Sequence, residues 1–123
     1  MNKILFIEDE TSLQKTIADY LATEGYQVIS AYEGESGLAL AEKETPDLIL
    51  LDLILPKKNG FEVLSALKEN KKTKDIPVIV FTNLEGTKDV EKALSLGATT
   101  YLVKANYSLK EVIEKIKNSL SQH

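Results

Sequence analysis

The sequence predicts a doubly wound α/β fold, in which a five-stranded parallel sheet in the order 2-1-3-4-5 is covered by helices on both faces. Short runs of consecutive apolar residues recur along the chain, and such runs are typical of strands buried on both faces. Segments with apolar residues at helical spacing lie between these runs. Because the two kinds of segment alternate five times, right-handed crossovers should produce a parallel sheet between two helical layers.

The first strand and helix are separated by a cluster of carboxylates. Residues 4–7 form a continuous apolar run that stops at residues 8–10, which are all acidic. Thr11 and Gln14 then have the spacing of a capping box, which predicts the start of a helix. This helix should end by Gly25, and its apolar stripe is formed by Leu13, Ile17 and Leu21.

The second pair is predicted at residues 27–31, a strand, and residues 35–44, an Ala- and Leu-rich helix. A third strand at residues 48–51 is wholly apolar and ends at Asp52. Residues 53–59 are then predicted to form a loop.

Asn59 and Glu62 predict the capped start of a third helix, whose buried stripe consists of Phe61, Leu64 and Leu67. The polar residues 69–75 should form the return loop. A fourth strand is predicted at residues 77–81, and it ends at Thr82.

The fourth helix is marked by Val90, Ala93 and Leu94, and Gly97 closes it. Residues 99–103 should form the fifth strand, which Lys104 follows directly. Ser108 and Glu111 predict a capping box for the last helix, which has a strong amphipathic pattern formed by Leu109, Val112, Ile113, Ile116 and Leu120.

The chain has 123 residues, so we expect one domain, residues 1–123, with no output domain attached. Its net charge of −4 lacks the basic footprint of a nucleic-acid binder, and no segment resembles a signal peptide or membrane span. The lack of Cys fits a cytoplasmic location. The single histidine, His123, should be a frayed terminus and not a ligand, so histidine chemistry must come from a partner.

Four of the five predicted strands end in reactive side chains, at the edge where parallel sheets bind ligands: Glu8, Asp9, Asp52, Thr82 and Lys104. With the first and third strands adjacent, the three carboxylates would share one pocket, where repulsion costs roughly a few kcal/mol for each pair. The pocket therefore needs a cation. Without Cys or an internal His, a hard ion is favoured, and Mg²⁺ fits best.

A carboxylate, a hard divalent ion, a lysine and a hydroxyl are the parts of a phosphoryl-transfer site with an aspartate nucleophile. Asp52 is the candidate nucleophile, because it is the single carboxylate at the central strand. Mg²⁺ would offset charge on the phosphoryl oxygens, and Lys104 and Thr82 would hold the others.

Four separated segments agree in type, order and position with one family: Phe6-Ile7-Glu8-Asp9-Glu10, Leu51-Asp52-Leu53-Ile54-Leu55-Pro56-Lys57-Lys58-Asn59-Gly60, Phe81-Thr82 and Tyr101-Leu102-Val103-Lys104. The chain resembles, over nearly its whole length, the receiver domain of bacterial two-component response regulators, which has a flavodoxin-like, CheY-like fold. The resemblance implies that Asp52 is the phosphoacceptor. It also implies that Asp9 and Asp52 bind Mg²⁺ directly, that Glu8 acts through water and that Ile54 lends its backbone carbonyl.

The resemblance further makes Thr82 the switch hydroxyl, Lys104 the phosphate-binding lysine and Tyr101 the aromatic residue that swings inward. Pro56 and Gly60 match the loop that follows the phosphoacceptor. The implied function is a phosphorylation-dependent signalling switch, not a turnover enzyme: it catalyses only its own phosphorylation and dephosphorylation. A phosphohistidine of a sensor histidine kinase or histidine phosphotransfer protein would be the donor. The fourth helix, fifth strand and fifth helix would bind a target protein or a second copy, with no nucleic acid or membrane partner.

The sequence departs from the family in the residues that follow the switch groups. Ala105 replaces the usual proline, so we predict a trans bond after Lys104 or visible local strain, since a cis bond would cost about 2.5–4 kcal/mol. Asn83 is larger than the usual small residue. Ile54 and Leu84 are apolar and cannot orient an attacking water, so we expect slow self-dephosphorylation.

Three other functions stay open at this point. Ala105 and Asn83 leave room for a pseudo-receiver that only binds proteins. A flavodoxin-like FMN carrier would share the fold, but the acidic residues 8–10 would repel its phosphate. An aspartyl phosphatase would usually carry a second acid at the position of Ile54.

Overall fold

The computed structural model describes residues 2–121, and His123 lies outside them. Strands and helices alternate along the chain. The strands are β1 (Lys3–Ile7), β2 (Gln27–Ala31), β3 (Leu48–Leu51), β4 (Val78–Thr82) and β5 (Thr100–Val103). The helices are α1 (Thr11–Thr23), α2 (Gly34–Glu44), α3 (Gly60–Glu69), α4 (Thr87–Ser95) and α5 (Leu109–Ser121), with a short 3₁₀ helix, η1 (Lys104–Asn106), between β5 and α5.

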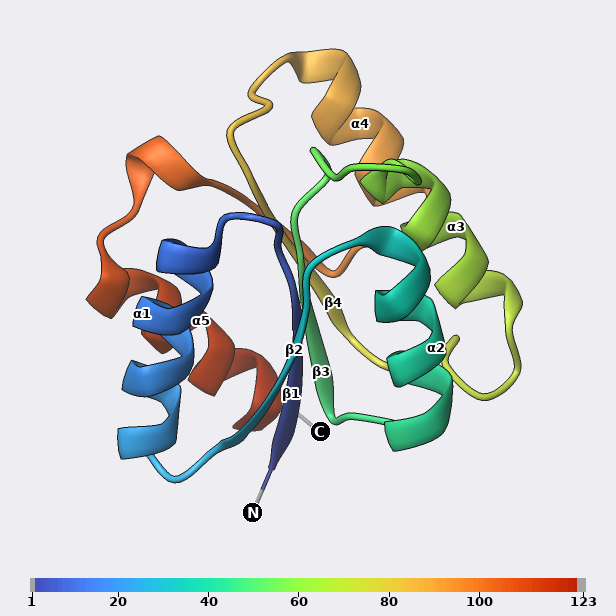
Figure 1. The fold of residues 1–123 in the computed structure, drawn as a ribbon. Helices are drawn as coiled ribbons and strands as arrows, with labels where there is room; N and C mark the ends of the chain where they lie inside the picture. Colours follow the sequence, from blue (N-terminus) through green and yellow to red (C-terminus); the bar gives the residue numbers. More distant parts are fainter. Residues whose placement is uncertain (1, 122–123) are drawn as a thin grey trace.

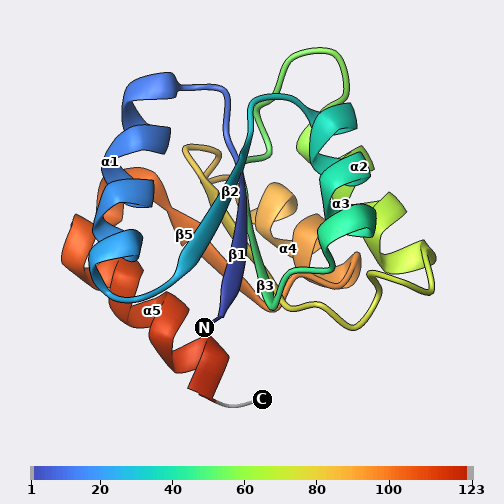
Figure 2. The same ribbon diagram turned by 60° about the horizontal axis from the view of Figure 1, so that its bottom comes forward.

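The five strands form one parallel sheet in the order β2-β1-β3-β4-β5, which confirms the predicted topology. Helices α1 and α5 cover one face, and α2, α3 and α4 cover the other (Figure 1; Figure 2). Because all strands run in the same direction, their carboxyl ends meet at one edge of the sheet.

Alternate residues of each buried strand point into two separate cores, one under each helical layer. On β1, Ile4 and Phe6 pack beneath α1 and α5, whereas Leu5 and Ile7 pack beneath α2, α3 and α4. Strands β1, β3 and β4 are therefore apolar on both sides, which explains their continuous apolar runs.

Two of the three predicted helix caps are present, and the one at Ser108 is a full capping box. The Asn59 side chain accepts a hydrogen bond from the Glu62 amide, and Ser108 and Glu111 bond to each other's backbone amides. The box predicted from Thr11 and Gln14 was wrong.

Helix α1 starts after Glu10, whose side chain makes no cap hydrogen bond within residues 2–121, and Thr11 is already helical. Gln14 is 1% exposed, and its side chain points into the protein interior rather than back along the helix.

The chain after β5 adopts a short 3₁₀ turn at Lys104–Asn106, where the family usually has a proline. The peptide bond between Lys104 and Ala105 is trans, as predicted, and residues 2–121 contain no cis bond. No helix in the same range is long and apolar enough to cross a membrane.

Candidate functional site

The carboxyl ends of β1 and β3 bring together the three predicted acidic residues. Glu8, Asp9 and Asp52 each offer a carboxylate oxygen, and these oxygens lie within 4.8 Å of one another. Strand pairing explains this arrangement, because Ile7 is in register with Leu51 and the Asp52 amide donates to the Ile7 carbonyl at 3.0 Å. The residues that follow the two strands are therefore neighbours.

Lys104 reaches this acidic cluster from the end of β5. Its Nζ lies 2.7 Å from Glu8 Oε1 and 2.9 Å from Asp52 Oδ2, and Asp52 is only 3% exposed. The ammonium group also lies 5.7 Å from the ring centroid of Phe81 on β4. The lysine side chain thus spans the end of β4, the strand that separates β5 from β3.

The electrostatics of the cluster favour a further cation. The pKa of Glu8 is raised to about 7, chiefly by burial and also by the nearby Asp52 charge, although the bonds to Lys104 and to the Glu10 amide act in the opposite direction. Burial by itself lowers the pKa of Lys104, but its bonds to Glu8 and Asp52 outweigh this and raise the pKa above its ordinary value. Three carboxylates against one ammonium group leave an excess of negative charge when all are ionised.

The loop after Asp52 is held close to the site. The Ile54 amide donates to Asp52 Oδ1 at 3.0 Å, and the Gly60 amide donates to the Leu53 carbonyl at 2.8 Å. A Cβ atom on Gly60 would lie 2.3 Å from the Leu53 Cα, so only glycine allows this approach. The Ile54 side chain is 52% exposed.

Thr82 and Tyr101 are linked through one residue. The Thr82 hydroxyl oxygen, at the end of β4, accepts from the Leu84 amide at 3.4 Å. The Tyr101 hydroxyl donates to the Leu84 carbonyl at 2.6 Å. Burial raises the pKa of Tyr101, so this hydroxyl keeps its proton and remains a donor. Both side chains therefore contact the backbone of residue 84, which follows the exposed Asn83.

Gln14 is a buried residue next to the site, and the capping pattern in the sequence did not predict its burial. Its Nε2 donates to the carbonyls of Phe6 at 2.9 Å and Ala31 at 3.1 Å, and lies 3.4 Å from the Glu8 carbonyl. Gln14 shares the buried stripe of α1 with Ile17 and Leu21. The helical spacing of Gln14, Ile17 and Leu21 is the signal in the sequence that could have placed Gln14 in the interior.

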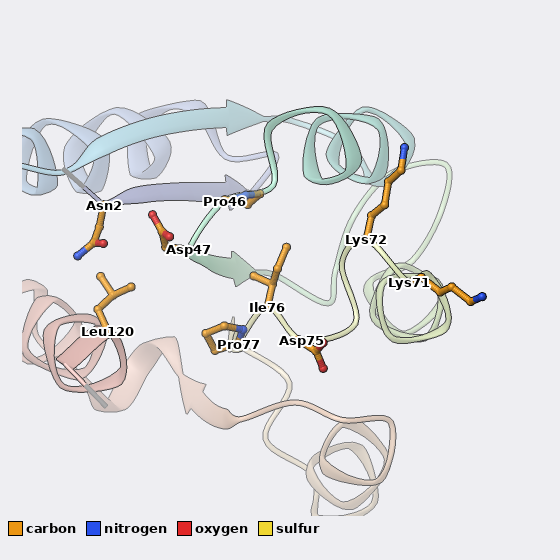
Figure 3. Close-up of a pocket in the computed structure, with 9 residues that line it drawn as sticks. All are labelled: Asn2, Pro46, Asp47, Lys71, Lys72, Asp75, Ile76, Pro77 and Leu120. Carbon is orange, nitrogen blue, oxygen red and sulfur yellow. The ribbon is translucent and has the colours of Figure 1, made fainter. Parts of the chain in front are cut away.

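A cavity of about 310 Å³ lies at the opposite, amino-terminal edge of the sheet (Figure 3). It mixes basic, acidic and apolar residues: Asn2, Pro46, Asp47, Lys71, Lys72, Asp75, Ile76, Pro77 and Leu120. None of these is one of the predicted site residues.

The family model described as response regulator receiver domain matches residues 4–117 of the chain. Over 122 residues the chain is 41% identical to the transcriptional regulatory protein CiaR of Streptococcus pneumoniae, covering 99% of this chain and 53% of that protein. The chain spans about half the length of the curated relatives it matches.

Solved structures show the same similarity. The CheY-like response regulator receiver domain protein of Methanospirillum hungatei JF-1 has a TM-score of 0.92 and 29% identity, covering 99% of this chain and 95% of that one. The Mn(2+)-bound form of response regulator Rcp1 has a TM-score of 0.82 and 32% identity, and the match covers 96% of this chain and 91% of that one.

Proposed function

The chain belongs to the response regulator receiver domain family, and on this basis we propose that Asp52 accepts a phosphoryl group from the phosphohistidine of a sensor histidine kinase or histidine phosphotransfer protein. The observation that carries the proposal is the contact of Lys104 with both Glu8 and Asp52 inside a cluster of three carboxylates. A nucleophilic carboxylate and a fixed cation are thereby placed where phosphoryl charge would develop.

Magnesium is the proposed cofactor, and the cluster fits it. All the side-chain donors are oxygen atoms, and their excess negative charge needs a cation. Asp9 and Asp52 would bind the ion directly, Glu8 through water and Ile54 through its carbonyl. When bound, Mg²⁺ would neutralise charge on the phosphoryl oxygens. The related response regulator Rcp1 is described in a Mn(2+)-bound form, which supports the binding of a divalent ion by this chain.

The reaction transfers one phosphoryl group. A carboxylate oxygen of Asp52 attacks phosphorus, the phosphorus–nitrogen bond breaks, and its electron pair leaves with the donor imidazole. Lys104, already 2.9 Å from Asp52, would then hold a phosphoryl oxygen, and the Thr82 hydroxyl would donate to another. The chain acts once per phosphoryl group and is a switch, not a turnover enzyme.

The response would pass through residue 84. If Thr82 moves toward the phosphoryl group, its contact with the Leu84 amide changes, and so does the carbonyl that holds the Tyr101 hydroxyl. Tyr101 would then turn inward on β5. The α4-β5-α5 face would thereby change its affinity for a target protein or a second copy.

We also propose that the phosphorylated form is long-lived. The side chains of Ile54 and Leu84 lack a group that could orient an attacking water. The exposed Asn83, which is larger than the usual small residue, would narrow the path to the phosphoryl group. Asp52 loaded from acetyl phosphate and Mg²⁺ should keep its phosphoryl group for minutes or longer. Decay within seconds would contradict this.

The partners and location of the whole protein are proposals. The related CiaR is named as a transcriptional regulatory protein, and the chain covers 53% of it, so the transcriptional role is that relative's. For the present residues, the net charge of −4 supports binding to protein rather than nucleic acid. The lack of Cys supports a cytoplasmic location.

Intact-mass measurement tests the proposed function. Acetyl phosphate with Mg²⁺ should add roughly 80 Da, one phosphoryl group, to the wild type and nothing to Asp52→Asn. Omission of Mg²⁺ should prevent the gain. A wild type that gains no mass would support the pseudo-receiver instead, and a gain in Asp52→Asn would place the phosphoryl group elsewhere.

A further inference from the structure

We propose that Gln14 is a positioning residue for the metal site: its side-chain amide fixes the peptide between Glu8 and Asp9 and thereby aims both carboxylates. This inference rests on the proposed function, since it concerns how the same site is held.

The first argument is where the amide donates. The carbonyls of Phe6 and Ala31 stand at the carboxyl ends of β1 and β2, and Gln14 Nε2 bonds to them at 2.9 and 3.1 Å. The Ala31 carbonyl also accepts from the Glu8 amide at 2.9 Å. Gln14 therefore extends the hydrogen bonding of the sheet beyond the last pair of β1 and β2, and ties it to α1.

The second argument is that the Gln14 amide contacts the peptide between two of the proposed metal-binding residues. The Glu8 carbonyl, 3.4 Å from Gln14 Nε2, belongs to the peptide that joins Glu8 to Asp9. A change in the backbone torsions on either side of this peptide would change how the two carboxylates lie relative to one another. Within the turn, the Glu10 amide donates to Glu8 Oε2 at 3.1 Å, but the described residues give α1 no side-chain cap at Glu10. The turn lies at the same end of the sheet as the first turn of α1 (Figure 1).

The third argument is the cost of a glutamine at this position. Gln14 Oε1 is buried and has no hydrogen-bond partner among residues 2–121. A buried acceptor without a partner is unfavourable, and an apolar side chain of similar length would avoid that cost. The three carbonyls around Nε2 also fix the orientation of the amide, since the oxygen atom could not face them. The restraint that the Gln14 amide places on the three carbonyls offsets this cost.

The test compares Gln14→Met with Ile17→Val. Methionine keeps the length of the side chain but donates no hydrogen bond, whereas Ile17→Val loosens the same buried face of α1 one turn later. Mg²⁺ affinity of the unphosphorylated protein is measured by calorimetry. Phosphorylation rates with acetyl phosphate are then measured over a range of Mg²⁺ concentrations.

We expect Gln14→Met to weaken Mg²⁺ binding by about tenfold, at the low end for loss of a group that orients metal ligands. Its phosphorylation rate at saturating Mg²⁺ should stay within about threefold of wild type, because Asp52 and Lys104 are untouched. Ile17→Val should leave Mg²⁺ affinity unchanged within about twofold. Equal affinity in Gln14→Met and wild type, or equal losses in both variants, would overturn the inference.

Amide hydrogen exchange without Mg²⁺ gives a readout that is independent of phosphorylation. The amides of Glu8 and Glu10 should exchange faster in Gln14→Met, while the amides of α5 exchange as in wild type. Unchanged exchange of the Glu8 and Glu10 amides would contradict the proposed restraint by Gln14. If the wild type takes up no phosphoryl group but these amides still respond, the proposed function fails and the positioning role stands. If the wild type is phosphorylated and Gln14→Met behaves identically, only the positioning role fails.

Discussion

Glu8 is the most tightly enclosed carboxylate of the site. It is fully buried, its Oε1 contacts Lys104, and its Oε2 accepts from the Glu10 amide at 3.1 Å. Burial raises its pKa to about 7, so the folded protein binds this proton more tightly than the unfolded chain does. The Glu8 charge therefore lowers stability as pH rises from about 4.5 to about 7.

The Glu8→Gln variant should lack this fall in stability. In Mg²⁺-free buffer we expect its free energy of unfolding to exceed that of wild type by roughly 3 kcal/mol at pH 8, and to be similar near pH 4. Urea unfolding across this pH range measures the difference. Glu91→Gln, on the exposed surface of α4, controls for the loss of one charge. Unfolding free energies of wild type and Glu8→Gln that change with pH in the same way would contradict the prediction.

Gly60 is the residue that lets the loop after Asp52 close. A Cβ there would meet the Leu53 Cα at 2.3 Å and the Asp52 carbonyl at 2.6 Å. We expect Gly60→Ala to lower the free energy of unfolding by at least about 2 kcal/mol, because backbone atoms must move. Gly86→Ala is the control, since its Cβ would meet only Asp89 Oδ2, at 3.4 Å. Similar denaturation midpoints for the two variants would count against this account.

Helix starts in this chain are held in different ways. Ser108 and Glu111 form a full capping box at α5, whereas Thr11 at α1 makes no such bond within the described residues. Ser108→Ala should therefore lower the free energy of unfolding by about 1 kcal/mol, and Thr11→Ala should change it by less than about 0.5 kcal/mol. Urea unfolding compares the two. If both variants lost the same unfolding free energy, Thr11 would act as a cap of α1.

The same local pattern thus gave a correct cap at residue 108 and a wrong one at residue 11. At Ser108 the helix start is exposed, so the capping side chains bond to their own backbone. At α1 the stripe of Gln14, Ile17 and Leu21 is buried against the sheet, and carbonyls of β1 and β2 bind the Gln14 amide instead. Those acceptors lie up to 17 positions away in the sequence, beyond a local pattern.

The molecule as a whole assembles the acidic cluster, so Mg²⁺ should bind the folded chain and not the unfolded one. Mg²⁺ at about 100 times its dissociation constant should raise the free energy of unfolding by about 2.7 kcal/mol. The gain should largely vanish in Asp9→Asn. Thermal unfolding with NaCl at matched ionic strength separates binding from screening. A gain in Asp9→Asn equal to that of wild type would exclude this residue as a ligand.

The sequence alone determined the order of the elements, the parallel sheet and the residues at the strand ends, because these follow from hydrophobic spacing and the single direction of the strands. Tertiary structure decided which of those groups touch. The contact of Lys104 with Glu8 and Asp52 depends on strand register and on a side chain that spans β4. The link from Tyr101 to Leu84, and the burial of Gln14 behind β1, likewise depend on packing between distant segments. Spacing along a chain specifies which face of an element is buried, but hydrogen-bond partners are chosen only when those faces meet.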